Sequence, residues 1–142
     1  MNQKRIGYLI GVCYCITFIY FLFFADFRKN IYPNVNLIPF STIVKIIREY
    51  WNYDKLYIIL NIGGNLFLLF PIPLFFNLKI SYKKLLVFSF LLPIFIELIQ
   101  YISKTGSADI DDVLLNSLGY ILGCIFYQKT KLFLPKSESN KS

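Results

Sequence analysis

The sequence predicts an all-α membrane protein with four transmembrane helices and an amphipathic surface helix in the first extracytoplasmic loop. Composition is the first reason: 56% of the 142 residues are hydrophobic, 19% are aromatic and only 16% are charged, with a mean hydropathy of +0.56. Soluble domains carry about 25% charged residues. The second reason is that the apolar residues gather in four runs of about 20, the length needed to cross about 30 Å of hydrocarbon. We therefore expect one membrane domain over residues 1–128 and a basic cytoplasmic tail over residues 129–142.

The first expected helix covers residues 6–24, which are uncharged and follow Lys4 and Arg5. A cleaved signal peptide is the alternative for this run. Its apolar core, however, is longer than the roughly 7–15 residues of a signal peptide, and no A-x-A cleavage site follows. We expect the helix to be retained as a membrane span.

Prolines interrupt the next two expected helices, about residues 57–76 and 85–102. Pro71 and Pro73 leave backbone carbonyls one turn earlier without an amide partner, which predicts a break near Phe67 to Leu69. Pro93 predicts a second kink. The fourth expected helix, about residues 109–127, is the most polar at its start.

The loop before the second span contains an expected surface helix. Its apolar residues recur at helical spacing: Ile43, Val44, Ile46, Ile47, Tyr50 and Trp51. Charged residues fall on the other side, and Ser41 is the expected N-cap. This pattern predicts a helix lying on the membrane, with Trp51 at the level of the headgroups.

The basic residues predict the orientation in the cell membrane. Four spans place both termini on one side, where the terminal segments and the 79–84 loop hold nine lysines and arginines, against six on the other side. The positive-inside rule therefore places both termini in the cytoplasm.

Residue types exclude several functions. Histidine is absent, which removes Ser-His-Asp and Cys-His catalysis and the commonest zinc ligand. Cys13, Cys15 and Cys124 lie in apolar runs and predict no disulfide. The net charge of +7 comes from residues that flank apolar runs, so we expect no nucleic-acid partner. No cofactor is expected, and no metal-ligand motif is present.

Polar residues inside the apolar runs are the candidate functional residues. Glu97, Asn65 and Asn116 lie 13, 14 and 13 residues from the lysines at the cytoplasmic ends of their helices, about 20 Å along each helix. One turn further out lie three more polar residues, Gln100, Asn61 and Asp112. A carboxylate such as Glu97 costs about 2.5 kcal/mol or more in a bilayer. The cluster is therefore interpreted either as a hydrated pocket open to the outside or as a cation site with oxygen ligands.

A less specific interpretation stays open beside these two. The amides can act as hydrogen-bonding contacts between helices, while Asp109 and Asp111 are merely solvated at a helix N-terminus. Along the fourth helix the polar and small residues form one stripe: Asp109, Asp112, Asn116, Gly119 and Gly123. Its G-x-x-x-G end predicts close approach of another backbone.

Four motifs together resemble the VanZ-like membrane proteins. They are NLIPF at Asn36–Phe40, Asn65 followed by Pro71, ELIQY at Glu97–Tyr101, and GSADIDDVLLNSLGYILG at Gly106–Gly123. The chain departs from the family pattern at Pro73, where glycine is common, and at Ser107, where many members have arginine. The resemblance implies a cytoplasmic-membrane protein that lowers susceptibility to teicoplanin-type glycopeptides.

The sequence and the resemblance together give a set of candidate residues. The binding candidates are Asn36, Asn65, Glu97, Gln100, Asp109, Asp112 and Asn116, and the helix-packing candidates are Gly119, Gly123 and Pro71. The expected partners are membrane lipids and a lipid-linked envelope precursor or a lipoglycopeptide.

Two other functions stay open. An intramembrane enzyme acting on a lipid-linked substrate could use Glu97 and Asp112 as an acid/base pair. The missing histidine and nucleophile motif favour a binding protein over an enzyme. A small transporter subunit would have to oligomerise, because one four-helix unit is too small for the usual inverted repeat. The sequence leaves the oligomeric state open.

Overall fold

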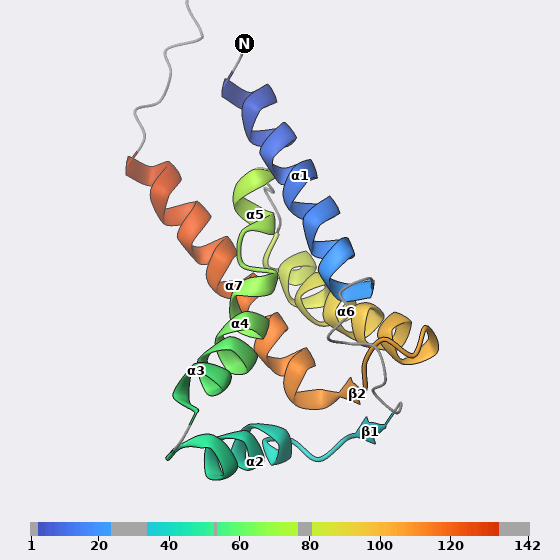
Figure 1. Cartoon of the computed structure of the whole chain (residues 1–142). Coiled ribbons are helices and arrows are strands. Elements are labelled where there is room, and N and C mark those ends of the chain that lie inside the picture. The colour runs from blue at the N-terminus through green and yellow to red at the C-terminus, as the bar shows by residue number, and fades with distance from the viewer. Residues whose placement is uncertain (1–2, 24–33, 53, 77–80, 134–142) are drawn as a thin grey trace, which may run out of the picture.

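The protein is mostly helical in a computed structural model that describes residues 3–23, 34–52, 54–76 and 81–133 (Figure 1). Its longer helices are α1 (Gln3–Phe23), α2 (Ser41–Tyr50), α6 (Tyr82–Ile102) and α7 (Ile110–Phe133). Between α2 and α6 lie α3 (Lys55–Ile58), the π-helix η2 (Ile59–Gly63), α4 (Gly64–Leu68) and α5 (Ile72–Phe75). Two short strands complete the order, β1 (Val35–Asn36) and β2 (Ala108–Asp109).

Three helical stretches of the described chain are long and apolar enough to cross a membrane. They are Lys55–Phe75, Lys83–Ile102 and Ile110–Thr130, and a shorter apolar helix covers Gly7–Tyr20 within α1. Less than half of each of the three is buried inside the protein. Large apolar side chains such as Ile16, Phe67 and Phe95 are therefore exposed along the helices, as expected where lipid is the solvent.

The stretch Lys55–Phe75, called the broken stretch below, is interrupted where the prolines predict it. α4 ends at Leu68 and α5 begins at Ile72, with Pro71 between them, so the expected break near Phe67 to Leu69 is confirmed. The Leu68 carbonyl, which loses its helical partner there, accepts a hydrogen bond of 2.5 Å from the Tyr14 hydroxyl of α1.

The core lies between the broken stretch, α6 and α7. It consists of Leu69, Leu85, Ile96, Tyr120 and Cys124, with Phe18, Leu68, Ile72 and Leu92 packed against it. In Figure 1, α2 lies across one end of the bundle, where β1, β2 and the start of α7 also lie. The first described residue of α1 and the last of α7 lie at the opposite end.

The last helix, α7, differs from the expected helix at both of its ends. α7 begins at Ile110, because Asp109 belongs to β2, and it continues through Lys129 to Phe133. The expected tail therefore starts as helix. α6 continues through Pro93 as one helix of 21 residues.

Candidate functional site

Two short parallel strands join the segment before α2 to the start of α7. Val35 lies opposite Ala108, and Asn36 lies opposite Asp109. Asn36 Nδ2 donates to Asp109 Oδ1 at 3.1 Å and to Thr42 Oγ1 at 2.9 Å. Thr42 Oγ1 in turn donates to Asp109 Oδ2 at 2.5 Å. The expected site residues Asn36 and Asp109 therefore meet, and their contacts hold α2 to α7.

Asp111 caps the N-terminus of α2 although the two are far apart in the sequence. Its carboxylate accepts hydrogen bonds from the backbone N–H groups of Phe40 at 2.5 Å, Thr42 at 2.9 Å and Ile43 at 3.1 Å. The Asp111 side chain is completely buried. Phe40 precedes the helix in the left-handed conformation, with φ of 64°. The three amides, which have no partner within a helix, are thus satisfied by one carboxylate.

This arrangement corrects two interpretations of the sequence. Ser41 is not the N-cap but the first residue of α2, and its hydroxyl donates to Asn36 Oδ1 at 2.9 Å. Asp109 and Asp111 are not solvated at a helix N-terminus, because they are only 7% and 0% exposed. The acceptor that caps α2 and the side-chain donors to Asp109 each come from a segment about 70 residues away, which helical periodicity does not describe.

Asp112 and Asn65 form the second contact of the site, between α7 and α4. Asn65 Nδ2 donates to Asp112 Oδ1. One turn further along α7, Asn116 Nδ2 donates to the Asp112 backbone oxygen at 2.8 Å. The Asn116 carbonyl oxygen is buried without a hydrogen-bond partner in the described part of the chain. Asn61, expected near Asp112, instead donates to the Tyr57 backbone oxygen of its own helix.

Glu97 and Gln100 reach the site from α6, and both are buried. Glu97 Oε2 accepts a hydrogen bond of 3.2 Å from the Asp109 backbone N–H. Gln100 packs beside Gly106, and its backbone oxygen accepts from the Thr105 and Gly106 amides at 3.0 and 3.3 Å. Gln100 therefore helps to shape the turn that leads from α6 to β2.

Gly119 and Gly123 lie where α7 meets the broken stretch. A Cβ atom on Gly119 would overlap the Leu66 carbonyl oxygen, and one on Gly123 would overlap the Phe70 carbonyl oxygen. Only glycine allows the backbones to approach this closely. Pro71 is the N-cap of α5, so it ends the segment that these glycines contact.

Four carboxylates, which we call the acidic cluster, form the centre of the site: Glu97, Asp109, Asp111 and Asp112. Asp111 N–H donates to Asp109 Oδ1 at 2.9 Å, which links two of them directly. In the described residues, the partners of Asp109 and Asp111 are all neutral amide, hydroxyl and peptide groups. A site of this charge repels anions and favours groups that donate hydrogen bonds or carry positive charge.

The described residues contain no group of three or more Cys, Asp or Glu side chains arranged to hold a metal ion. The carboxylates accept instead from separate backbone amides, side-chain amides and the Thr42 hydroxyl.

Residues 6–134 match the family model described as VanZ/LLP1. The chain belongs to the VanZ/LLP1 family. No curated protein and no solved structure gives a significant match. In this VanZ/LLP1 protein, the motifs that carried the resemblance contribute the residues that meet at one end of the bundle.

Two residues of this VanZ/LLP1 site were missing from the candidates. Asp111 carries no local signal for its contact with α2, because it lies in the first turn of α7 and accepts from amides about 70 residues away. Thr42 carries no such signal, since it contacts Asp109 across 67 residues of chain.

Proposed function

We propose that this VanZ/LLP1 protein crosses the cell membrane four times, keeps both termini in the cytoplasm, and lowers the susceptibility of its cell to teicoplanin-type glycopeptides. In this arrangement the acidic cluster lies at the outer end of the bundle. It binds an envelope component there, either a lipid-linked precursor or the lipoglycopeptide itself.

The length and position of α1 support a fourth span beside the three long apolar stretches. Its 21 residues extend about 30 Å, the thickness of the hydrocarbon core. α1 also packs along the bundle against α5, through Gly11 and Phe75. The larger number of basic residues at the end that holds both termini supports placing that end in the cytoplasm.

The burial of three carboxylates of the acidic cluster, Glu97, Asp109 and Asp111, is the observation that carries the proposed role. A carboxylate in the membrane is costly, so buried acidic residues mark functional sites more often than exposed ones. Glu97 is 6% exposed and lies on α6, while Asp112 contacts Asn65 of α4. Three helices thus contribute to one negatively charged site, which suits a ligand with amine, amide or hydroxyl donors.

Antibiotic susceptibility tests the proposal directly. A susceptible Gram-positive host would express the wild type, Glu97→Gln or Asp112→Asn, with membrane levels matched by immunoblot. We expect the wild type to raise the inhibitory concentration of teicoplanin severalfold and that of vancomycin much less. Each variant keeps the shape of the side chain but removes the charge, so we expect both to lose most of the protection.

Asp54→Asn is the matched control. Asp54 is exposed and caps α3 by accepting from the Tyr57 N–H, and asparagine is an equally good cap. This variant removes one carboxylate outside the cluster and should protect like the wild type. The proposed role fails if the wild type gives no protection, or if equally abundant Glu97→Gln and Asp112→Asn protect as well as it does.

A further inference from the structure

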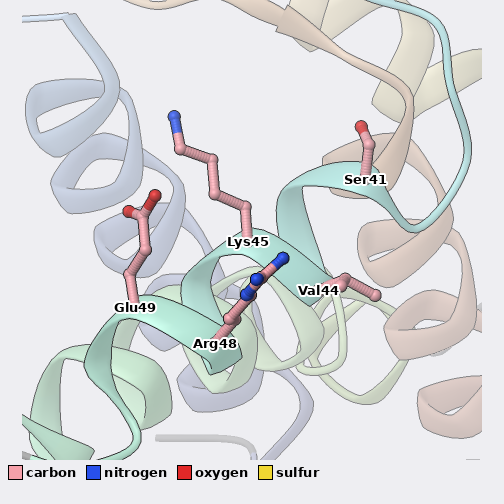
Figure 2. A pocket seen from close by; sticks show the side chains of 5 residues that line it. All are labelled: Ser41, Val44, Lys45, Arg48 and Glu49. Atoms are coloured by element: carbon pink, nitrogen blue, oxygen red, sulfur yellow. The ribbon is translucent and has the colours of Figure 1, made fainter.

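The exposed side of α2 carries a hollow, called the α2 hollow below. Its lining includes two positively charged side chains, whereas the acidic cluster consists of carboxylates. The hollow has a volume of about 490 Å³ and is lined by Ser41, Val44, Lys45, Arg48 and Glu49 (Figure 2). Figure 2 shows Ser41, Lys45 and Glu49 projecting from the same side of the helix. The hollow is thus lined by two cationic groups, one hydroxyl and one carboxylate within about two turns of α2.

The two cations are available to a ligand. Neither the Lys45 ammonium nor the Arg48 guanidinium forms an ion pair or hydrogen bond with another described residue. They are three residues apart, so they lie on neighbouring positions of one helix face. The planar guanidinium of Arg48 suits two oxygens of a phosphate, while the lysine ammonium adds a point charge. This combination favours an anion with several oxygens.

Apolar side chains flank the hollow and are also exposed. Val44 is 58% exposed, and Trp51, at the end of α2, is 57% exposed. Leu37 and Ile38, in the turn before the helix, are more than two-thirds exposed. The ammonium of Lys55 lies 5.5 Å from the centre of the Trp51 ring, which keeps a third cation beside this surface. A helix with cations beside exposed apolar groups is typical of a membrane interface.

The direction of α2 is fixed, so the hollow is formed before any ligand arrives. Three backbone amides at the N-terminus of α2 donate to the buried Asp111, and Thr42 donates to Asp109. These contacts hold the N-terminal turn of α2 against α7. The cations then need no rearrangement of the helix to contact a phosphate, which lowers the entropic cost of binding.

We propose that the α2 hollow binds the phosphate of an anionic phospholipid. Lys45 and Arg48 contact the phosphate, and the exposed apolar side chains of α2 lie against the acyl chains of the same lipid. This site is separate from the acidic cluster, and it does not depend on the role proposed for that cluster. The cluster would repel the anion that the hollow attracts.

Trp51 makes the proposal measurable, because it is the only tryptophan in the chain and lies one turn beyond Arg48. The purified full chain would be reconstituted in phosphatidylcholine nanodiscs that contain a small fraction of brominated phosphatidylglycerol or brominated phosphatidylcholine. Bromine quenches tryptophan only at short range. We expect the brominated anionic lipid to quench Trp51 at about one-tenth of the mole fraction that the neutral lipid needs. High salt should weaken this preference.

Variants of charged residues separate a specific site from general attraction. Lys45→Gln/Arg48→Gln should abolish the preference for the anionic lipid. Lys83→Gln/Lys84→Gln removes the same charge from exposed residues at the start of α6 and should leave it intact. Glu49→Gln should strengthen the preference, a change that misfolding would not produce.

Three results would overturn the proposal. The first is equal quenching of the wild type by the two brominated lipids. The second is an unchanged preference in Lys45→Gln/Arg48→Gln. The third is an equal loss in the two double variants, which would show that total charge, and not the hollow, attracts the lipid.

Discussion

Asp111 stabilises a helix to which it is not adjacent in the sequence. Its buried carboxylate accepts from three backbone amides of the first turn of α2 and the residue before it. These hydrogen bonds are charge-assisted, and the helix dipole adds to them because the N-terminus carries partial positive charge. The side chain therefore combines the role of an N-cap with that of a tertiary contact.

Asp111→Ala should lower the free energy of unfolding by about 2–4 kcal/mol, because it leaves three partly buried amides without an acceptor. The unfolding midpoint of the purified protein, followed by circular dichroism during titration with SDS, measures the loss. Asp111→Asn keeps one acceptor oxygen and should lose less.

Asp54→Ala is the control for this prediction. Asp54 caps α3 at an exposed position through a single amide, so its removal should cost about 1 kcal/mol. If Asp111→Ala is no more destabilising than Asp54→Ala, then the long-range cap contributes nothing beyond an ordinary one.

The sequence contains part of this site and not the rest. Glu97 and Asp112 attract attention because charged residues are rare in apolar runs, and the spacing of Asn116, Gly119 and Gly123 shows which face of α7 meets protein. The pairs formed by Asn36 with Asp109 and by Asp111 with α2 join residues about 70 positions apart. No local periodicity encodes such pairs.

At the scale of elements, glycine sets the distance between α7 and the broken stretch. The carbonyl oxygens of Leu66 and Phe70 occupy the positions that Cβ atoms on Gly119 and Gly123 would take. This contact brings Asn65 within hydrogen-bonding distance of Asp112. Packing at the two glycines therefore helps to position the Asn65–Asp112 pair.

Gly119→Ala and Gly123→Ala should each destabilise the protein by about 1–3 kcal/mol or more, because a methyl group must displace a backbone carbonyl and not a mobile side chain. The same SDS titration measures the change.

Gly64→Ala is the matched control. Gly64 lies in α4 with no atom within 4 Å of a new Cβ, so alanine there should be neutral or stabilise by about 0.4–1 kcal/mol. Equal effects at all three positions would contradict a specific close approach.

An element can be predicted from the sequence when residues within that element determine its structure. Pro71 breaks its helix through its own ring, so the break was visible in the sequence. The extension of α7 from the expected end near Tyr127 to Phe133 was not predicted, because the basic residues from Lys129 onward were interpreted as a tail. The pairing of β1 with β2 joins segments about 70 residues apart, so no local pattern encodes it, and the π-helix at Ile59–Gly63 was not predicted.

At the scale of the whole molecule, two regions of opposite charge share one end of the bundle. Asp109 and Asp111 of the acidic cluster are buried and contact the N-terminal turn of α2, while Lys45 and Arg48 are exposed on α2 itself. Asp111 and Asp109 hold the two regions together through the N-terminal turn of α2.

The number of spans decides on which side of the membrane this end lies. With four spans, the first residue of α1 and the last of α7 share the cytoplasmic side, as the distribution of basic residues favours. We expect a green fluorescent protein fused to the C-terminus to fluoresce and alkaline phosphatase at the same position to be inactive. Tags at both ends should resist protease added to intact spheroplasts, while alkaline phosphatase fused after Asn52 should be active.

If α1 did not span, three spans would place the termini on opposite sides, and the protease would remove one tag and leave the other. That result would reduce the count to three and require a new assignment of the side on which the acidic cluster and α2 lie.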